Sequence, residues 1–214
     1  QTGALEPINV PVGGKVLDLE VGNGKLFVAG EFGPFGGSSR TRIGSIDLTN
    51  DSVSSWNPVL KEPFGSLQVT AIQARNNVVY TAGEFGSING TRRDDFAGID
   101  TSTGKVIKWT KYKRTYKYAF TGSALGKNTF YPCGYLTQFG RGSSAVTRQG
   151  IAGIDMSSGH LTEWNIALSG SGGTAHRTPV VDECVIDDGK LYVSGAFTSV
   201  GGKFQTNFAV FDGI

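Results

Sequence analysis

The stretch LFVAGEFGPFGG, residues 26–37, decides the fold because related stretches return three more times along the chain. The other copies are VYTAGEFGSING (79–90), FYPCGYLTQFGRG (130–142) and LYVSGAFTSVGG (191–202). The copies share one anchor glycine, which is Gly30, Gly83, Gly134 and Gly195 in turn. Recurrence at roughly 50–60 residues is typical of propeller blades, each of which is one supersecondary unit. The sequence therefore predicts four repeat units.

A second shared segment follows each copy and carries an aspartate. These aspartates are Asp47, Asp100, Asp155 and Asp212. They stand 17, 17, 21 and 17 residues after the anchor glycines, so only the third unit carries an insertion, of four residues. All three tryptophans of the chain, Trp56, Trp109 and Trp164, lie nine residues after the first three aspartates. Unrelated segments would not place every tryptophan at one repeat position, so the repetition is real.

Each unit is expected to contain four strands. In the first unit, residues 16–21 alternate apolar and polar side chains, Asn23-Gly24 is a strong tight-turn signal, and residues 25–32 form the return strand. Two further strands follow before residue 60. We therefore predict an all-β fold, a β-propeller of four blades with four antiparallel strands each. The single domain divides into units at about 13–60, 61–113, 114–168 and 169–214, with residues 1–12 added to the last.

The two ends of the chain predict how the ring closes. Residues 2–9 align with residues 158–165, which places Ile8 in the tryptophan slot, and the fourth unit stops after its third strand. The N-terminal strand is therefore expected to complete the last blade beside Phe208–Asp212, which removes an open sheet edge. Two alternatives remain: the strand completes the last blade of a neighbouring molecule, or two chains pair into a larger ring.

Composition excludes several classes of protein. Among 214 residues, 32 are glycine without the collagen period, and 38% are hydrophobic, which is enough for a packed core. A net charge of +2 gives no global attraction to nucleic acid or acidic membranes, and no apolar run is long enough to span a bilayer. The chain begins with Gln1, as expected for a mature end after removal of a leader.

Cysteines and glycosylation sequons point to an extracytoplasmic protein. Cys133 and Cys184 are too far apart for a CxxC motif; they can form one disulfide or be two small buried residues. Asn50 and Asn89 each begin an N-x-S/T sequon at a predicted turn. We predict a secreted or cell-surface protein, and a glycoprotein if the producer glycosylates.

In these shared segments the four units resemble the delta-60-type β-propeller repeats of secreted and surface-anchored bacterial proteins. The resemblance rests on the anchor-glycine stretch, the aspartate segment and the tryptophan that follows, and it covers nearly the whole chain. It implies a propeller that serves as a surface, adhesion or structural module and has no shared active site. The third unit departs from the pattern at Pro132-Cys133.

Candidate catalytic residues are few. His160 lies in a predicted turn and His176 in a Gly/Ser-rich stretch, and neither belongs to a catalytic motif. The repeated aspartates are interpreted as turn residues that accept local backbone hydrogen bonds, and not as a ring of metal ligands. We predict no enzyme activity, cofactor or metal; the alternative is an extracellular hydrolase or lyase with its site at the propeller channel.

Repeat-set arginines and tryptophans are also interpreted structurally. Arg40, Arg93 and Arg148 stand seven residues before the aspartates, with Gln205 in the fourth slot, and are expected to pair with nearby backbone or carboxylate groups rather than to bind anions. The tryptophans are expected to pack between blades.

One segment lies outside the repeat plan. Residues 108–118 carry five positive charges and three tyrosines, while the rest of the chain has a net charge of −3. Basic residues interleaved with aromatics suit polyanions or a protein interface, and a solvated connector is the alternative. The predicted partner-binding residues are Lys111, Tyr112, Lys113, Arg114, Tyr116 and Lys117. The expected partners are a surface protein or glycan and other copies of the chain, with no specific nucleic acid.

Overall fold

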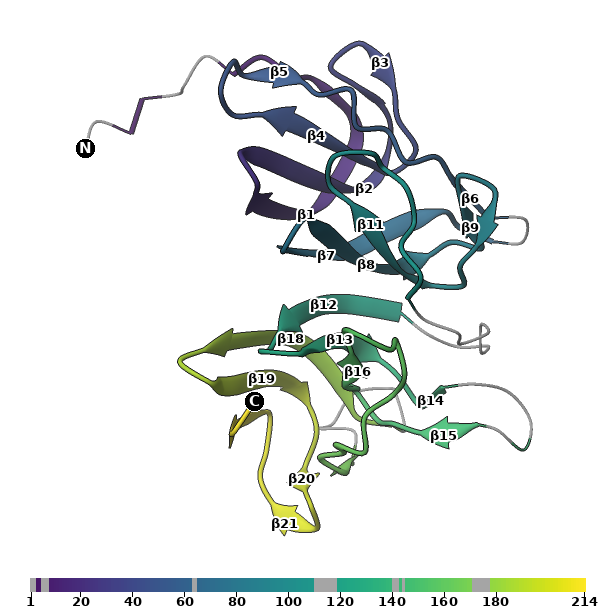
Figure 1. Cartoon of the computed structure of the whole chain (residues 1–214). Helices are drawn as coiled ribbons and strands as arrows, with labels where there is room; N and C mark the ends of the chain where they lie inside the picture. Colours follow the sequence, from purple (N-terminus) through teal and green to yellow (C-terminus); the bar gives the residue numbers. More distant parts are fainter. Residues whose placement is uncertain are drawn as a thin grey trace.

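The fold consists of β-sheets connected by turns (Figure 1). The structure, a computed structural model, describes residues 3–4, 8–62, 65–109, 119–139, 143, 145–170 and 178–214. These ranges contain no α-helix, and so no helix long and apolar enough to cross a membrane. The all-β prediction is confirmed.

Four antiparallel sheets follow one another along the chain, one for each repeat unit, and we call them blades 1 to 4. Their innermost strands are β1 (Val12–Gly22), β7 (Gln68–Arg75), β12 (Ala119–Leu125) and β18 (Val180–Asp187). Their second strands are β2 (Lys25–Phe35), β8 (Val78–Glu84), β13 (Thr129–Tyr135) and β19 (Lys190–Ala196). Their third strands are β4 (Ile43–Asp47), β11 (Phe96–Asp100), β16 (Ile154–Asp155) and β22 (Phe208–Asp212).

In blades 1 to 3 the fourth strand is shorter than predicted. Blade 1 has β5 (Ser52–Val53), which pairs with β4. In blades 2 and 3 the corresponding segment makes one bridge each, Ile99 with Val106 and Ile154 with Leu161. The remaining two-residue strands belong to the turns and links: β3 (Ser38–Ser39), β6 (Leu60–Lys61), β9 (Ser87–Ile88), β10 (Thr91–Arg92), β14 (Gln138–Phe139), β15 (Val146–Thr147), β17 (Leu168–Ser169), β20 (Ser199–Val200) and β21 (Lys203–Phe204).

The anchor glycines recur because two backbones come very close at that position. A Cβ on Gly83 would lie 2.3 Å from the carbonyl oxygen of Gln68 on the adjacent inner strand. The other three anchor glycines have the same environment, with a backbone oxygen at 2.1–2.2 Å. In each blade the pairing register shifts next to this glycine, as at a β-bulge. Only glycine fits there.

The blades pack face to face in chain order, and each interface has its own apolar core. Tryptophan completes two of these cores. Trp56 packs edge-on against Phe27 of its own blade with ring centroids 5.0 Å apart, and its indole N–H donates to the carbonyl of Asp100 in blade 2, at 2.8 Å. Trp109 repeats both contacts with Tyr80 and Asp155. The prediction of inter-blade packing is confirmed.

The predicted closure of the ring is not confirmed by the strand pairings of the described residues. In the described part of the chain no strand pairing joins blade 4 to blade 1, and β22 pairs with β19 alone. The N-terminal segment instead lies along blade 1, where Val12 pairs with Phe35 and the Gly36 N–H donates to the Pro11 carbonyl. The described strands thus form four consecutive blades, with blades 1 and 4 at opposite ends of the molecule in Figure 1. The expected N-terminal strand beside Phe208–Asp212 is not seen among the described residues.

Candidate functional site

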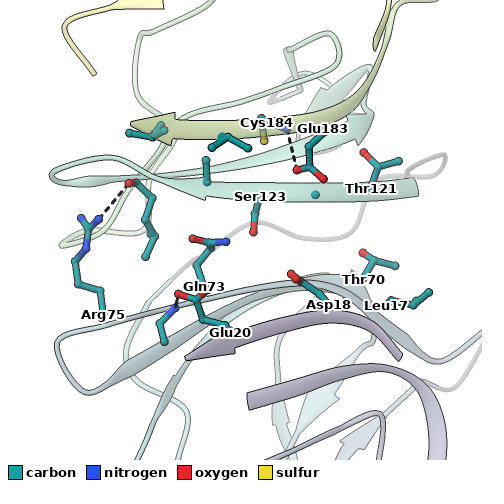
Figure 2. A pocket seen from close by; sticks show the side chains of 16 residues that line it. Leu17, Asp18, Glu20, Thr70, Gln73, Arg75, Thr121, Ser123, Glu183 and Cys184 are labelled. Atoms are coloured by element: carbon teal, nitrogen blue, oxygen red, sulfur yellow. Dashed lines mark hydrogen bonds between the residues drawn. The ribbon is translucent and has the colours of Figure 1, made fainter. Parts of the chain in front are cut away.

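A cavity of about 450 Å³ lies between the innermost strands of all four blades. Its walls come from β1, β7, β12 and β18, so the cavity occupies the position of a propeller channel. Figure 2 shows Asp18 and Glu20 on one side of it and Glu183 on the other. Pockets of this size accommodate small ligands or a protruding side chain.

Asp18 and Glu20 are held by the free edge of the neighbouring blade. The backbone N–H of Ile72 donates to Asp18 Oδ2 at 2.7 Å, and that of Ala74 donates to Glu20 Oε1 at 3.1 Å. Both carboxylates come from β1, where alternate side chains point to the same face. They therefore satisfy the N–H groups of β7 while they face the cavity.

Glu183 and Ser123 complete the polar lining from the opposite blades. The Glu183 carboxylate lies over Gly122, where a Cβ would meet its Oε1 at 2.6 Å, so the absence of a side chain at Gly122 makes room for it. Ser123 is buried, and its hydroxyl has no hydrogen-bond partner among the described residues. Figure 2 shows this hydroxyl pointing from β12 into the cavity. A buried hydroxyl without a partner loses its hydrogen bonds to water, so a ligand that bonds to it would recover that loss.

Two carboxyl groups of the cavity, those of Asp18 and Glu20, have raised pKa values. Burial raises the pKa of Asp18 to about 6, and the negative charges of Glu20 and Glu183 add to the rise, while its backbone hydrogen bonds oppose it. Burial also raises the pKa of Glu20, against the effect of Arg75. The guanidinium of Arg75 is itself engaged, since it donates to the carbonyls of Leu125, at 3.1 Å, and Gly126. A cation placed between the carboxylates would lower these pKa values, because it favours the ionised form. The ionised carboxylates would in turn attract the cation.

Sequence reasoning missed this cavity, although a signal was present. Asp18 and Glu183 occupy the same repeat position, twelve residues before the anchor glycine, where blades 2 and 3 have Ala71 and Gly122. Polar residues that break a repeat plan are candidates for acquired function. The alternating pattern of residues 16–21 concealed Asp18, because it reads equally well as a solvated strand face.

The predicted partner-binding segment is not among the described residues. Lys111, Tyr112, Lys113, Arg114, Tyr116 and Lys117 lie outside the described residues, as does His176. His160 is exposed in the turn after Asp155, where its carbonyl accepts from the Asp155 N–H.

Three of the four repeated aspartates, Asp47, Asp100 and Asp155, are turn residues, as predicted. Asp155 Oδ1 accepts from the hydroxyl and N–H groups of Ser157 and Ser158, all at 2.7–3.1 Å. These bonds lower the pKa of Asp155 to about 2, and the bond from the Ser157 hydroxyl has the largest effect. Asp100 is held in the same way by Ser102 and Thr103, and Asp47 by Thr49. Their oxygens are engaged locally, which supports a turn role over a metal-binding one.

The repeated arginines pair with backbone carbonyls. Each uses Nη1 for the carbonyl of the preceding residue and Nη2 for a carbonyl fourteen residues further on. The distant acceptors of Arg40, Arg93 and Arg148 are Ser54, Ile107 and Thr162, at 2.9, 3.2 and 2.8 Å. The arginine therefore links the turn to the outer segment of its own blade.

Cys133 and Cys184 are joined by a disulfide that connects β13 of blade 3 to β18 of blade 4, with Cα atoms 6.5 Å apart. Of the two arrangements left open by the sequence, the structure has the bond. The carboxylate of Glu183 is close to both sulfur atoms, but bonded cysteines supply no thiolate for a metal.

The two sequons differ in how their amides are engaged. Asn50 is exposed, and its Oδ1 accepts from Ser52. Asn89 uses both ends of its amide: Oδ1 accepts from the Val59 N–H and Nδ2 donates to the Gly104 carbonyl, each at 2.8 Å. A glycan on Nδ2 of Asn89 would compete with the second bond.

Comparison with known proteins supports the propeller assignment. Residues 22–43 and 187–209 match the DUF5122 β-propeller, a domain of unknown function, and the two segments contain Gly30 and Gly195. No curated protein matches this chain. The crystal structure of the computationally designed Ika4 protein is similar in fold, with 13% identity, a TM-score of 0.53, and coverage of 93% of this chain and 91% of that one. The designed Ika8 protein matches with 13% identity and a TM-score of 0.34, over 92% of this chain and 70% of its own. The chain thus carries β-propeller repeats, while the finer delta-60 assignment stays a prediction.

Proposed function

We propose that this β-propeller chain is a secreted or cell-surface binding module that acts without catalysis, and that its inner-strand cavity binds a protonated amine of its partner. The observation that carries the proposal is the buried, unpartnered hydroxyl of Ser123 in a cavity lined by three carboxylates. A primary ammonium group is a compact cation with three donors, which suits carboxylates and a hydroxyl that converge from different sides.

An extracytoplasmic location is supported by the disulfide. Bonds such as Cys133–Cys184 persist in oxidising compartments and are rare where glutathione keeps thiols reduced. In that setting a protonated amine has two sources that share its chemistry, the lysine side chains of a surface protein and the amino groups of a deacetylated glycan.

The non-catalytic part of the proposal rests on how the repeated polar residues are used. The aspartates hold turns and the arginines bind backbone carbonyls, so these side chains are committed to the blade plan. One observation favours the alternative of a hydrolase at the channel: Asp18 has a pKa of about 6 and can hold a proton near neutral pH. Both of its carboxylate oxygens already accept a backbone N–H, from Leu19 and Ile72, which argues for a positioned binding group.

Calorimetric titration tests the function. The probes are a lysine-rich peptide, a glucosamine oligomer and its N-acetylated form, which lacks the charge. The amine-bearing probes should bind, and Glu183→Gln and Ser123→Ala should each weaken binding about tenfold. Asp187→Asn is the matched control, because Asp187 lies on the same strand outside the cavity. Equal binding of the charged and acetylated oligomers would refute the amine assignment, and hydrolysis of any probe that Asp18→Asn abolishes would establish the enzyme instead.

A further inference from the structure

Blade 1 exposes a face that every other blade buries. The position fourteen residues before the anchor glycine is Val69, Phe120 or Val181 in blades 2 to 4, and each is covered by the preceding blade. In blade 1 it is Val16, which is 41% exposed. Three residues later, Ile72 and Cys184 are buried in blades 2 and 4, whereas Leu19 in blade 1 is 55% exposed. The uncovered side of β1 is thus an inter-blade face without a neighbour.

Blade 4 exposes the opposite face in the same way. Four residues before the repeat aspartate, Ile43, Phe96 and Ile151 are buried against the following blade. The equivalent residue in blade 4 is Phe208, which is 51% exposed. Val185 is 52% exposed as well, while its counterpart Ala124 in blade 3 is buried under blade 4. Large apolar residues gathered on one face of a soluble protein mark an interaction surface.

The N-terminal segment enters blade 1 as a link from a preceding blade would. Leu60 pairs with Ile88 in blade 2 and Leu168 with Val200 in blade 4, each four residues after a tryptophan. Val12 pairs with Phe35 at the equivalent position of blade 1, four residues after Ile8.

One backbone hydrogen bond repeats at the three places where the chain enters blades 1, 2 and 4. The Gly36 N–H donates to the Pro11 carbonyl at 2.8 Å, and the same bond joins Asn89 to Val59 and Gly201 to Ala167, at 2.8 and 3.2 Å. Ile8 therefore occupies the position that the tryptophan of a preceding blade would have. Its side chain is exposed.

Blade 4 has an aromatic residue that is suited to pack against Ile8. Phe27, Tyr80 and Tyr131 each pack edge-on against the tryptophan of their own unit, with centroids 5.0 Å apart in all three pairs. The fourth member of the series is Tyr192, in the unit whose tryptophan slot is filled by Ile8 in the sequence alignment.

We propose that blade 4 of one chain packs against blade 1 of a second copy of the same chain, whose Ile8 covers Tyr192, and that two copies close one ring of eight blades. The two faces fit because each repeats a face already joined to its counterpart inside the chain. A head-to-tail interface used at both ends by two copies closes with twofold symmetry, and eight blades lie within the usual range for propellers. The assembly does not depend on the ligand of the cavity.

The first experiment measures mass in solution by light scattering over a range of concentrations. The chain should have twice its mass of 22.6 kDa. Leu19→Asp and Phe208→Asp each place a charge in both interfaces, and each should weaken dimerisation about a hundredfold or more. A 1:1 mixture of the two variants should dimerise better than either alone, because one of its two interfaces is then unaltered. The matched controls are Leu48→Asp and Val146→Asp, which replace exposed apolar residues away from both faces.

The second experiment traps the contact covalently. A chain carrying Ile8→Cys and Tyr192→Cys should give a disulfide-linked dimer on oxidation, and the native cysteines do not interfere because they are bonded to each other. A monomer at every concentration, a ladder of larger species, or an internal bond between the two introduced cysteines of one monomer would each overturn the two-copy ring. Circular dichroism and melting curves equal to those of the unmodified chain establish that the aspartate variants are folded.

Discussion

The sulfur atoms of Cys133 and Cys184 join the second strand of blade 3 to the first strand of blade 4. The bond closes a loop of about fifty residues and crosses an inter-blade interface, so it limits the separation of two sheets that otherwise meet through apolar side chains.

Removal of this disulfide should destabilise the chain. The double change Cys133→Ala with Cys184→Ala is expected to lower the free energy of unfolding by about 3–4 kcal/mol, because the unfolded chain regains the freedom that the loop restricted. Urea titrations of the two proteins measure the difference, and a reducing agent should destabilise only the unmodified chain. Two alkylatable thiols in the unreduced protein would contradict the bond.

An alanine at an anchor glycine should have a larger effect than an alanine elsewhere. In Gly83→Ala the new Cβ would collide with the Gln68 carbonyl, and the bulge must open to accept it. We expect a loss of roughly 2–4 kcal/mol, in the range of severe core substitutions. Gly33→Ala is the control, because nothing lies within 4 Å of its Cβ and its φ is not positive. Equal midpoints of thermal unfolding for the two variants would show that the close approach is not needed.

The cavity makes stability depend on pH through Asp18. The pKa of this carboxyl is about 6 in the folded protein, against 3.8 for an unperturbed aspartate, so its protonation favours the folded state. Its contribution is fully present below pH 3.8 and is lost as the pH rises through about 6. After allowance for solvent screening the effect is about 1–2 kcal/mol.

Asp18→Asn isolates this effect, because an amide oxygen can still accept the Ile72 N–H without a charge. The variant should be more stable than the parent at pH 7, and its advantage should vanish near pH 4. Denaturant titrations at pH 4, 5, 6 and 7 provide the measurement, with the exposed change Glu31→Gln as control. An advantage that stays constant from pH 4 to pH 7 would rule out the titration of Asp18 as its cause.

Glycosylation should distinguish the two sequons. In a secreting eukaryotic host, the folded product is expected to carry a glycan at Asn50 and none at Asn89, whose amide nitrogen donates to the Gly104 carbonyl. Peptide mass spectrometry gives the occupancy of each site, and Asn50→Gln should remove the whole mass increment. Full occupancy of Asn89 in correctly folded protein would disprove the distinction.

The basic link between blades 2 and 3 should bind polyanions through charge. Replacement of Lys111, Lys113, Arg114 and Lys117 by serine is expected to reduce retention on an acidic glycan column, and retention of the parent chain should fall steeply with salt. Serine at Lys190 and Lys203, which lie in blade 4, is the control. If the fourfold variant is retained as strongly as the parent, the segment is a solvated connector.

The spacing of the repeated residues predicted the blades, because each recurring residue makes only local contacts. The aspartate turns, the arginine bonds and the tryptophan contacts involve the same unit or the next one, so the spacing of residues determines them. Closure of the ring is different, since it depends on the angle between successive sheets, to which every interface side chain contributes a little. The cavity also escaped prediction, because Asp18 and Glu183 are 165 residues apart in sequence and line one cavity only through the stacking of four sheets.

The common entry bond of blades 1, 2 and 4 has a consequence for how such a chain can evolve. Since the three N–H to carbonyl bonds are the same, a junction does not distinguish which blade precedes it. Duplication of a unit at one of these three junctions would leave the junction bond chemically unchanged, and each blade would still contact only its neighbours. Blade number can therefore change in single genetic steps, without simultaneous substitutions elsewhere in the chain.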